Sequence, residues 1–256
     1  MQQPTVSSVR WEWIGEGWRA FAEIWGTWVL HSLVSFLIIF VSMIPFFTLL
    51  GLGGMLTGSS SDGRPQAPSP LIFLAMLVLY PILILVTAYL AAGFYKTAFK
   101  QLRGEPISIG DVFSGGDSFL RVTGTLLLVA ILSFIGIFLC IIPAFIVQGL
   151  CFFALPLAVE KKLGPIAAIQ ASIEATRKDW LIYTLFAFVV SLIAGAGAIL
   201  CYVGLLASYP LYFLITAVAY RQVFGLDGMR NNVSYIPPPP PNYGGYDPPP
   251  PPSSWQ

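Results

Sequence analysis

The chain has 256 residues, of which 56% are hydrophobic and only 10% are charged, and its formal net charge is +1. Ordinary globular proteins carry about 25% charged residues, so this composition argues against a soluble domain. The basic residues are dispersed along the chain, without a basic run or a long basic helix face, which excludes nucleic-acid binding.

Charged residues are absent from four long windows of the sequence. Asp, Glu, Lys and Arg do not occur in 24–61, 65–95, 122–159 or 180–220. About 20 apolar residues suffice to cross a hydrocarbon core about 30 Å thick, and every window is longer than that. A soluble helix would carry charge on its outer face, which meets water. The windows therefore predict an all-α, polytopic transmembrane helical bundle.

The N-terminal segment, 1–27, is predicted to contain an amphipathic helix over 10–25. At 100° per residue, charged residues fall on one side and mostly aromatic residues on the other. The charged set is Glu12, Glu16, Arg19 and Glu23, and the apolar set is Trp11, Ile14, Trp18, Phe21, Ala22 and Trp25. Such a helix lies in the membrane interface or packs on the protein's own spans. The early charges also indicate that the segment is not a cleavable signal peptide.

The transmembrane domain is predicted over 28–225, with a Gly-, Pro- and Ser-rich loop at 51–70. As one helix, the third window would be about 57 Å long, nearly twice the core thickness. Pro143 divides it, and Gly204 and Pro210 offer breaks in the fourth window. The six predicted spans are about 28–50, 71–95, 122–141, 144–159, 181–203 and 206–222.

The polar segment 96–121 separates the second and third spans. Within it, Ser108 and Asp111 have the spacing of a capping box. Gly115 and Gly116 should interrupt any helix here, and Asp117 could cap the next one.

The distribution of basic residues predicts the orientation. With six spans and both termini inside, Arg64 is the only basic residue outside. The inside segments then hold Arg10, Arg19, Lys96, Lys100, Arg103, Arg121, Lys161, Lys162, Arg177, Lys178, Arg221 and Arg230. Cytoplasmic loops collect Lys and Arg, so this count favours six spans with both termini in the cytoplasm.

A weak internal repeat is visible along the chain. In 10–40, 107–137 and 167–197, a polar and partly amphipathic segment leads into an apolar span. The repeated unit would be an interfacial helix followed by a hairpin of spans, and three units would bury a common centre. Chance similarity among apolar sequences is the alternative.

The C-terminal segment, 226–256, is predicted to be a disordered, proline-rich tail. Pro237–Pro241 and Pro248–Pro252 are five-proline runs, which favour the polyproline II helix and cannot build a core. Pro240-Pro241-Asn242-Tyr243 matches the Pro-Pro-x-Tyr ligand pattern of WW domains. The tail therefore either recruits a cytoplasmic protein partner or is a passive solubilising end.

No group of residues in the sequence combines the ionisable and nucleophilic side chains that an active site needs. His31 is the one ionisable side chain among Asp, Glu, Lys, Arg and His in the four charge-free windows, and a lone His there is typically hydrogen-bonded. Cys140, Cys151 and Cys201 fit neither a disulfide framework nor a zinc site, and read as small buried hydrophobes. We predict no catalytic, cofactor-binding or metal-binding residues, no cofactor and no enzymatic activity.

Three segments resemble a family of uncharacterised bacterial multi-pass membrane proteins. They are 102–113 (LRGEPISIGDVF), 140–143 (CIIP) and 162–165 (KLGP) followed by Ala168 and Ser172. More distantly, the chain is similar to the membrane domain of some bacterial glycerophosphodiester phosphodiesterases, without their catalytic domain. Family members often have Gly where this chain has Ala144. The resemblance implies a multi-pass protein of the bacterial cytoplasmic membrane, and it carries over no catalytic residue.

Two functional hypotheses follow. The first is a non-enzymatic membrane protein that organises the lipid bilayer or partner proteins. The second is a carrier or channel for an apolar or amphipathic small molecule or lipid, because prolines interrupt the spans. The charge-free windows that form the spans lack Asp, Glu, Lys and Arg, which disfavours proton or sodium coupling. A polar cavity at mid-membrane depth would favour transport, and a packed centre would favour organisation.

Overall fold

The structure is a computed structural model that describes residues 9–57, 70–139, 141–199 and 203–226. Every element in these ranges is helical, which confirms the predicted all-α class. The elements are α1 (Glu12–Glu23), α2 (Trp25–Thr57), α3 (Pro70–Leu102), η1 (Ile109–Asp117), α4 (Phe119–Leu139), α5 (Ile141–Leu150), α6 (Ala154–Glu160), α7 (Pro165–Thr176), η2 (Arg177–Asp179), α8 (Trp180–Ala196), η3 (Gly197–Ile199) and α9 (Leu205–Phe224). The predicted tail lies outside the described residues from 227 onward.

Five helical stretches in the described ranges are long and apolar enough to cross a membrane. They are Trp25–Thr48, Leu79–Leu102, Phe119–Leu139, Ile142–Glu160 and Pro165–Ile199. These stretches coincide in order with the first five predicted spans, so the chain is a helical membrane protein. The sixth predicted span, 206–222, forms α9, which is helical but is not among the five because Tyr, Arg and Gln side chains lower its hydropathy.

Helix bounds differ from the predicted ones at several places. α2 continues to Thr57, into the predicted loop 51–70. A chain in lipid must satisfy its backbone hydrogen bonds internally, and a helix does so even where glycines are frequent. The glycine pair Gly115-Gly116 does not interrupt the next element, because both residues continue the 3-10 helix η1. In the fourth window the break falls at Gly204, and Pro210 lies inside α9.

The predicted span 144–159 is built from two helices rather than one. α5 ends at Leu150, a turn follows, and α6 begins at Ala154. Ser172 of α7 bridges this interruption, because its hydroxyl donates to the carbonyl oxygen of Leu150 (2.7 Å) and accepts from the backbone N–H of Phe153 (3.1 Å). The turn is therefore a defined feature whose free backbone groups are satisfied from a neighbouring helix.

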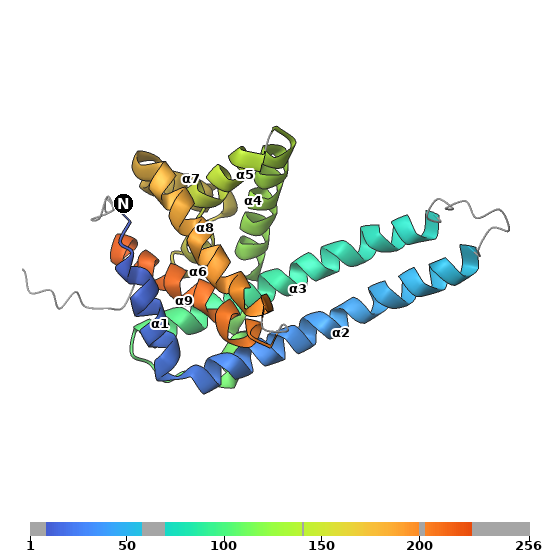
Figure 1. The fold of residues 1–256 in the computed structure, drawn as a ribbon, viewed down its shortest axis with the longest axis horizontal. Coiled ribbons are helices and arrows are strands. Elements are labelled where there is room, and N and C mark those ends of the chain that lie inside the picture. The colour runs from blue at the N-terminus through green and yellow to red at the C-terminus, as the bar shows by residue number, and fades with distance from the viewer. Residues whose placement is uncertain (1–8, 58–69, 140, 200–202, 227–256) are drawn as a thin grey trace, which may run out of the picture.

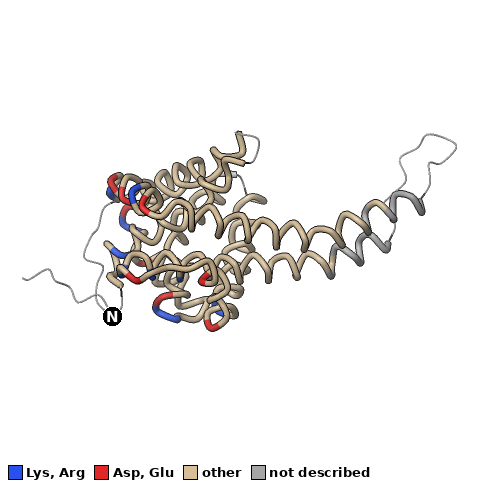
Figure 2. The backbone as a smooth tube through the Cα atoms, turned by 90° about the horizontal axis from the view of Figure 1, so that it is seen from below, with Lys and Arg blue, Asp and Glu red and all other residues tan. Residues whose placement is uncertain are grey.

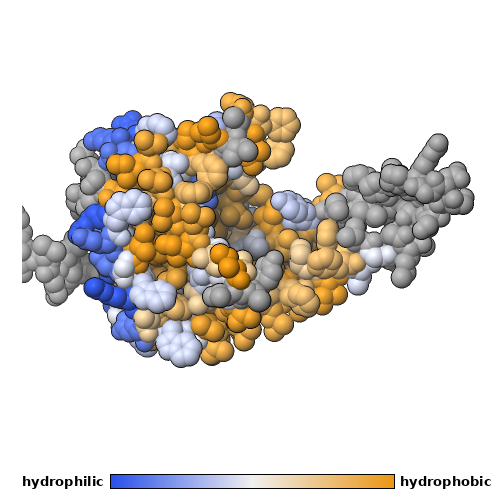
Figure 3. Space-filling view, viewed as in Figure 1, coloured by the Kyte–Doolittle hydropathy of each residue, from blue (hydrophilic) through white to orange (hydrophobic). Residues whose placement is uncertain are grey.

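α2 and α3 lie side by side and extend well beyond the remaining helices, which gather at one end of the molecule (Figure 1). Hydrophobic residues cover the middle of the molecule and much of the α2–α3 pair, whereas hydrophilic residues lie along the edge of the bundle at the opposite end (Figure 3). Among the described residues, hydrophilic side chains are therefore concentrated at the end of the molecule opposite the distal α2–α3 pair.

The order of elements repeats three times along the chain. α1 precedes the α2–α3 pair, η1 precedes α4 and α5–α6, and α7 precedes α8 and α9. Each unit therefore has a short leading helix and an apolar hairpin, as the weak sequence repeat predicts.

α9 lies at the centre of the bundle. It contacts α1, α2, α3, α6 and α8, and most of its residues from Leu211 to Tyr220 are buried. Aromatic rings fill the space around it. Phe213 stacks on Phe94 of α3 with ring centroids 4.7 Å apart, and Tyr220 lies 5.2 Å from Phe99. The centre is thus a packed aromatic core that joins the first and third units.

Candidate functional site

The charged residues of the described ranges lie in the bundle at one end of the molecule, away from the distal parts of α2 and α3 (Figure 2). The last two turns of α3, the helix η1 and the α6–α7 connection all contribute to this end. It is the place where ionisable groups from different units meet, and it is therefore the candidate functional site.

At this end the α-helix α3 and the 3-10 helix η1 face each other with polar and charged residues, although the two helices differ in pitch. Lys96 and Lys100 are one α-helical turn apart on α3, so they share a face. η1 has three residues per turn, which puts Asp111, Ser114 and Asp117 on one of its faces. Lys100 Nζ donates to both carboxylate oxygens of Asp111 at 3.0 Å, and Lys96 Nζ donates to the Ser114 carbonyl oxygen at 2.7 Å and contacts Asp117. These contacts of Lys96 and Lys100 thus hold η1 against α3.

A third ion pair connects α3 to the second unit. Arg103, at the end of α3, pairs with Glu160 at the end of α6, and the side chain of Glu160 is only 8% exposed. Two charged residues beside this pair, Glu105 and Lys162, are exposed. Lys162 has a φ of 51°, in the left-handed region, which is uncommon for a residue other than glycine.

These residues enclose a hollow of about 450 Å³. Its charged lining consists of Lys96, Lys100, Arg103, Lys162, Glu105, Asp111, Asp117 and Glu160, four cations and four carboxylates. The formal charge of the lining is therefore zero, and its ionisable groups are arranged as ion pairs rather than as a nucleophile with a base. Such a hollow suits binding of a polar group that carries both signs of charge.

Asp111 is held in its ionised form by its neighbours. Desolvation by itself would raise the pKa of this carboxyl, but hydrogen bonds from the backbone N–H of Ser108 (2.6 Å) and from Lys100 outweigh it, and the pKa lies below its usual value. The Ser108–Asp111 bond is one half of the predicted capping box. Asp117, which was predicted to cap the following helix, instead pairs with Lys96.

The N-terminal helix α1 joins the same end through α9. Trp13 donates from Nε1 to the side-chain oxygen of Gln222 at 2.8 Å, and Glu16 accepts from Arg221 at 3.0 Å. Glu16 thus faces α9, although the sequence placed it on a free polar face. Trp13 and Phe21 are buried, so one side of α1 packs on the protein's own helices.

Trp11, Trp18 and Trp25 recur every seventh residue and are 48, 56 and 63% exposed. Trp18 lies on α1, whereas Trp11 precedes that helix and Trp25 begins α2 after the break at Ile24. Trp11 also contacts Phe186 of α8, with ring centroids 5.6 Å apart. One face of α1 therefore packs on the protein's own helices, as one of the two alternatives predicts, and its placement in the membrane interface stays a prediction.

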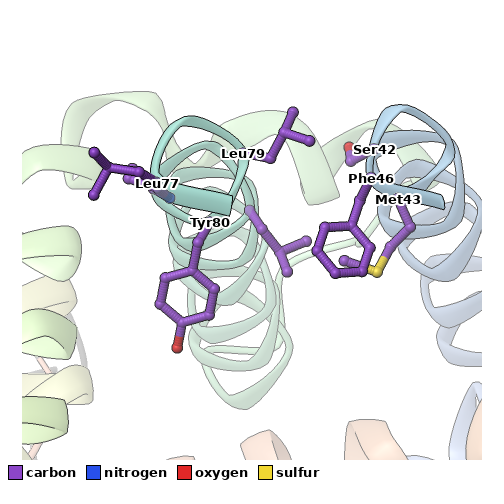
Figure 4. Close-up of a pocket in the computed structure, with 8 residues that line it drawn as sticks. Ser42, Met43, Phe46, Leu77, Leu79 and Tyr80 are labelled. Carbon is purple, nitrogen blue, oxygen red and sulfur yellow. The ribbon is translucent and has the colours of Figure 1, made fainter. Parts of the chain in front are cut away.

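Apolar grooves lie on the sides of the molecule. A groove of about 600 Å³ between α2 and α3 is lined mostly by apolar side chains, among them Met43, Phe46 and Leu77, with Ser42 and Tyr80 at its edges (Figure 4). A second groove, of about 430 Å³, lies between α4, α5, α6 and α9. It contains more polar groups: Ser133, Gln148, Cys151 and Tyr212.

His31 is placed away from the charged hollow. It is fully buried on α2 between Trp28 and Phe94, and its Nδ1 lies 3.0 Å from the carbonyl oxygen of Thr27. The histidine is thus a core residue with one hydrogen-bonded ring nitrogen, whereas its Nε2 is buried without a partner among the described residues. Among the described residues there is no group of three or more His, Cys, Asp and Glu side chains that could hold a metal ion.

Sequence reasoning missed the hollow, although two signals for it are present in the sequence. The first is the spacing of Lys96, Lys100 and Arg103, which places three cations on one helix face. The second is the three-residue spacing of Asp111, Ser114 and Asp117, which aligns polar groups only in a 3-10 helix. Because Gly115 and Gly116 are expected to interrupt any helix in this segment, the 3-10 alignment was not anticipated.

Comparison with known proteins gives relatives only among proteins of unknown activity. Uncharacterized proteins of Mycobacterium bovis and Mycobacterium tuberculosis are 31% identical to the chain over 170 residues, and a second Mycobacterium tuberculosis sequence is 30% identical. The match covers 66% of this chain and 52% of each relative, so the chain spans about half the length of the curated relatives it matches.

No family model matches the chain, and no solved structure matches it. Nothing in these comparisons supports the resemblance to the membrane domain of glycerophosphodiester phosphodiesterases. The chain is similar to uncharacterised bacterial proteins, and it is a helical membrane protein by its own composition and structure.

Proposed function

We propose that the chain is a non-enzymatic integral protein of the bacterial cytoplasmic membrane that organises the lipids, and through them partner proteins, along one face of the bilayer. The observation that carries the proposal is the combination of a packed centre with a single charged end. Aromatic side chains fill the core around α9, and the charged groups tie helices together at one interface.

The exposed indoles in and beside α1 support an interfacial role. Tryptophan prefers the headgroup level of a bilayer, where its ring is partly desolvated and its N–H stays near polar groups. Trp18 is exposed on α1, whose other side is fixed to α9, and the exposed Trp11 and Trp25 flank that helix. Rigidly held indoles order the lipids around them more than a mobile amphipathic helix would.

Reconstitution with spin-labelled lipids tests this role. Purified full-length protein should hold a motionally restricted lipid population near the headgroups, and Trp18→Ala combined with Trp25→Ala should reduce it. Phe138→Ala is the control, because it removes an even more exposed ring (80%, against 56% for Trp18 and 63% for Trp25) from the apolar helix α4. An unchanged restricted population in the double variant, or an equal loss in the control, contradicts the proposal.

The distribution of basic residues supports an orientation with the charged end and both termini in the cytoplasm. Cysteine labelling from outside intact cells tests it, in a background with the native cysteines replaced. A probe at Gly63 should label, and probes at Leu163 and Asn242 should not. Outside labelling at 163 would refute the division of the third window into two spans.

A carrier for an amphipathic molecule is the second candidate. The groove between α4, α5, α6 and α9 favours it, since Gln148 and Ser133 offer polar contacts within an apolar lining. Gln148 Nε2 lies 3.4 Å from the Ser191 hydroxyl, a long hydrogen bond that a ligand could replace. Protein-dependent flux of an amphipathic dye across liposomes, abolished by Gln148→Leu, would favour this candidate over the first.

The proline-rich segment 226–256 supports a protein partner in the cytoplasm. An aromatic groove binds polyproline II segments at low entropic cost because they are already extended. In this proposal the segment recruits a partner to the organised lipid surface. Deletion of 231–256 should then abolish recruitment of that partner and leave membrane insertion unchanged.

A further inference from the structure

We infer that the charged hollow at the end of α3 binds the headgroup of a zwitterionic phospholipid of the phosphoethanolamine class. This assignment names a ligand for the membrane-organising role proposed above. It rests on that proposal only for the position of the hollow at the level of the lipid headgroups.

The position of the hollow suits a headgroup. Lys96, Lys100 and Arg103 lie at the end of the stretch Leu79–Leu102 or just beyond it, and Glu160 ends the stretch Ile142–Glu160. The hollow is thus bounded by the ends of membrane-crossing helices, where lipid headgroups lie. Its volume of about 450 Å³ falls in the range of sites for small molecules.

Two side chains of the lining have no partner of their own. Asp111, Asp117 and Glu160 are each paired with a cation of α3. In the described part of the chain, by contrast, the side chains of Lys162 and Glu105 make neither a hydrogen bond nor an ion pair. One cation and one carboxylate therefore remain available to a ligand, which matches the two charges of a zwitterion.

Lys96 and Lys162 provide the place for the phosphate. Both side chains line the hollow, so an anion bound between them would be stabilised by both charges. An ammonium group has three donors, and Lys96 uses two of them on Ser114 and Asp117. The third donor, with the ammonium of Lys162, is free to bind phosphate oxygens.

The carboxylate side of the hollow selects the amine. A primary ammonium donates hydrogen bonds to carboxylates such as Glu105, whereas a choline group has no N–H to donate. Choline is usually bound by a cage of exposed aromatic rings. The lining contains a single aromatic residue, Phe99, and it is buried. The hollow should therefore prefer ethanolamine over choline headgroups, and a zwitterion over an anionic lipid.

Native mass spectrometry of the full-length protein in detergent tests the inference. The probes are short-chain phosphatidylethanolamine, phosphatidylcholine and phosphatidylglycerol, together with water-soluble phosphoethanolamine. We expect the ethanolamine lipid to bind most tightly, and free phosphoethanolamine to compete with it weakly. Tight binding of phosphoethanolamine alone would instead identify a soluble metabolite as the ligand and overturn the lipid assignment.

Three variants locate the binding. Lys162→Gln and Glu105→Gln each remove one charge-assisted contact and should weaken binding of the ethanolamine lipid about tenfold. Lys178→Gln changes an equally exposed lysine outside the hollow and should leave it unchanged. Equal affinity for the three lipids, or indifference to both hollow variants, overturns the inference. That outcome leaves the spin-label result on the indoles of Trp18 and Trp25 unaffected, so the two proposals fail separately.

Discussion

Gly93→Ala tests the close approach between α3 and η1 on which the charged hollow depends. A methyl group at this position would lie 2.0 Å from the carbonyl oxygen of Val112 and 2.8 Å from its carbonyl carbon. Even the shortest tolerable contact is about 3.0 Å, so η1 must move by at least about 1 Å. Because backbone atoms are involved, a change of rotamer cannot relieve the overlap.

The change in the free energy of unfolding caused by Gly93→Ala can be bounded from the typical magnitudes of helix propensity and overpacking. Replacing a helical glycine by alanine gains up to about 1 kcal/mol from helix propensity. Overpacking costs about 1–3 kcal/mol, and a 1 Å shift would also lengthen the 3.0 Å bonds between Lys100 and Asp111 beyond hydrogen-bonding distance. We expect a net loss of about 1–2 kcal/mol and a melting temperature lower by several degrees.

Gly15→Ala is the matched control, because Gly15 is also helical and a methyl group there meets nothing within 4 Å. Thermal unfolding of the detergent-solubilised variants, followed by circular dichroism, compares the two. Hydrogen exchange in 109–117 should accelerate only in Gly93→Ala. If Gly93→Ala melts at or above the temperature of Gly15→Ala, η1 does not pack on α3 as described.

Three further predictions concern the same end of the molecule. Lys162→Gly should be more stable than Lys162→Ala by about 1 kcal/mol in chemical denaturation, because only glycine adopts a φ of 51° without strain; equal stability would contradict it. Asp111 has a lowered pKa when folded, so its ionised form stabilises the fold above the unfolded pKa, and this stability is lost as pH falls through the folded value. Thermal melts from about pH 5 to about pH 3 should therefore show a larger loss for the wild type than for Asp111→Asn. Gly17→Ala should weaken α1 docking, since its methyl group would lie 2.6 Å from Ile215 Cγ1, and proteolysis of α1 should speed up if this is correct.

The membrane-crossing elements were predictable because lipid imposes a simple rule on composition. Charged side chains are excluded over about 20 residues, and the charge-free windows therefore located the apolar helices. The sequence also anticipated a division near Pro143, and α4 and α5 meet just before it. What composition could not supply was the turn between α5 and α6. That turn depends on Ser172, which lies on a helix of the next unit.

The candidate site was harder to predict than the spans for a related reason. Its ion pairs join separate elements: Lys100 and Lys96 of α3 pair with residues of η1, and Arg103 pairs with Glu160, 57 residues further along the chain. Local spacing shows which side chains share a face, but only packing shows which faces meet. The 3-10 pitch of η1 added a second difficulty, since it aligns Asp111 with Asp117 in a way that α-helical periodicity does not.

The central helix α9 shows that a helix of lower hydropathy can be more deeply buried inside a membrane protein than its more apolar neighbours. α9 is less apolar than the five stretches that qualify as spans, yet Phe213, Thr216 and Tyr220 are among its most deeply buried residues. The Thr216 hydroxyl of α9 donates to the carbonyl oxygen of Tyr212, one turn earlier on the same helix, at 2.6 Å. The partly exposed Thr184 of α8 makes the same bond within its own helix, so hydrogen bonding does not distinguish central from peripheral helices. Burial does: the stretch Phe119–Leu139, with a mean hydropathy of 2.5, is mostly unburied, whereas Leu79–Leu102, with a mean hydropathy of 1.6, is more than half buried. Within this bundle the most hydrophobic helices are therefore the peripheral ones, and moderate polarity in a span predicts a central position.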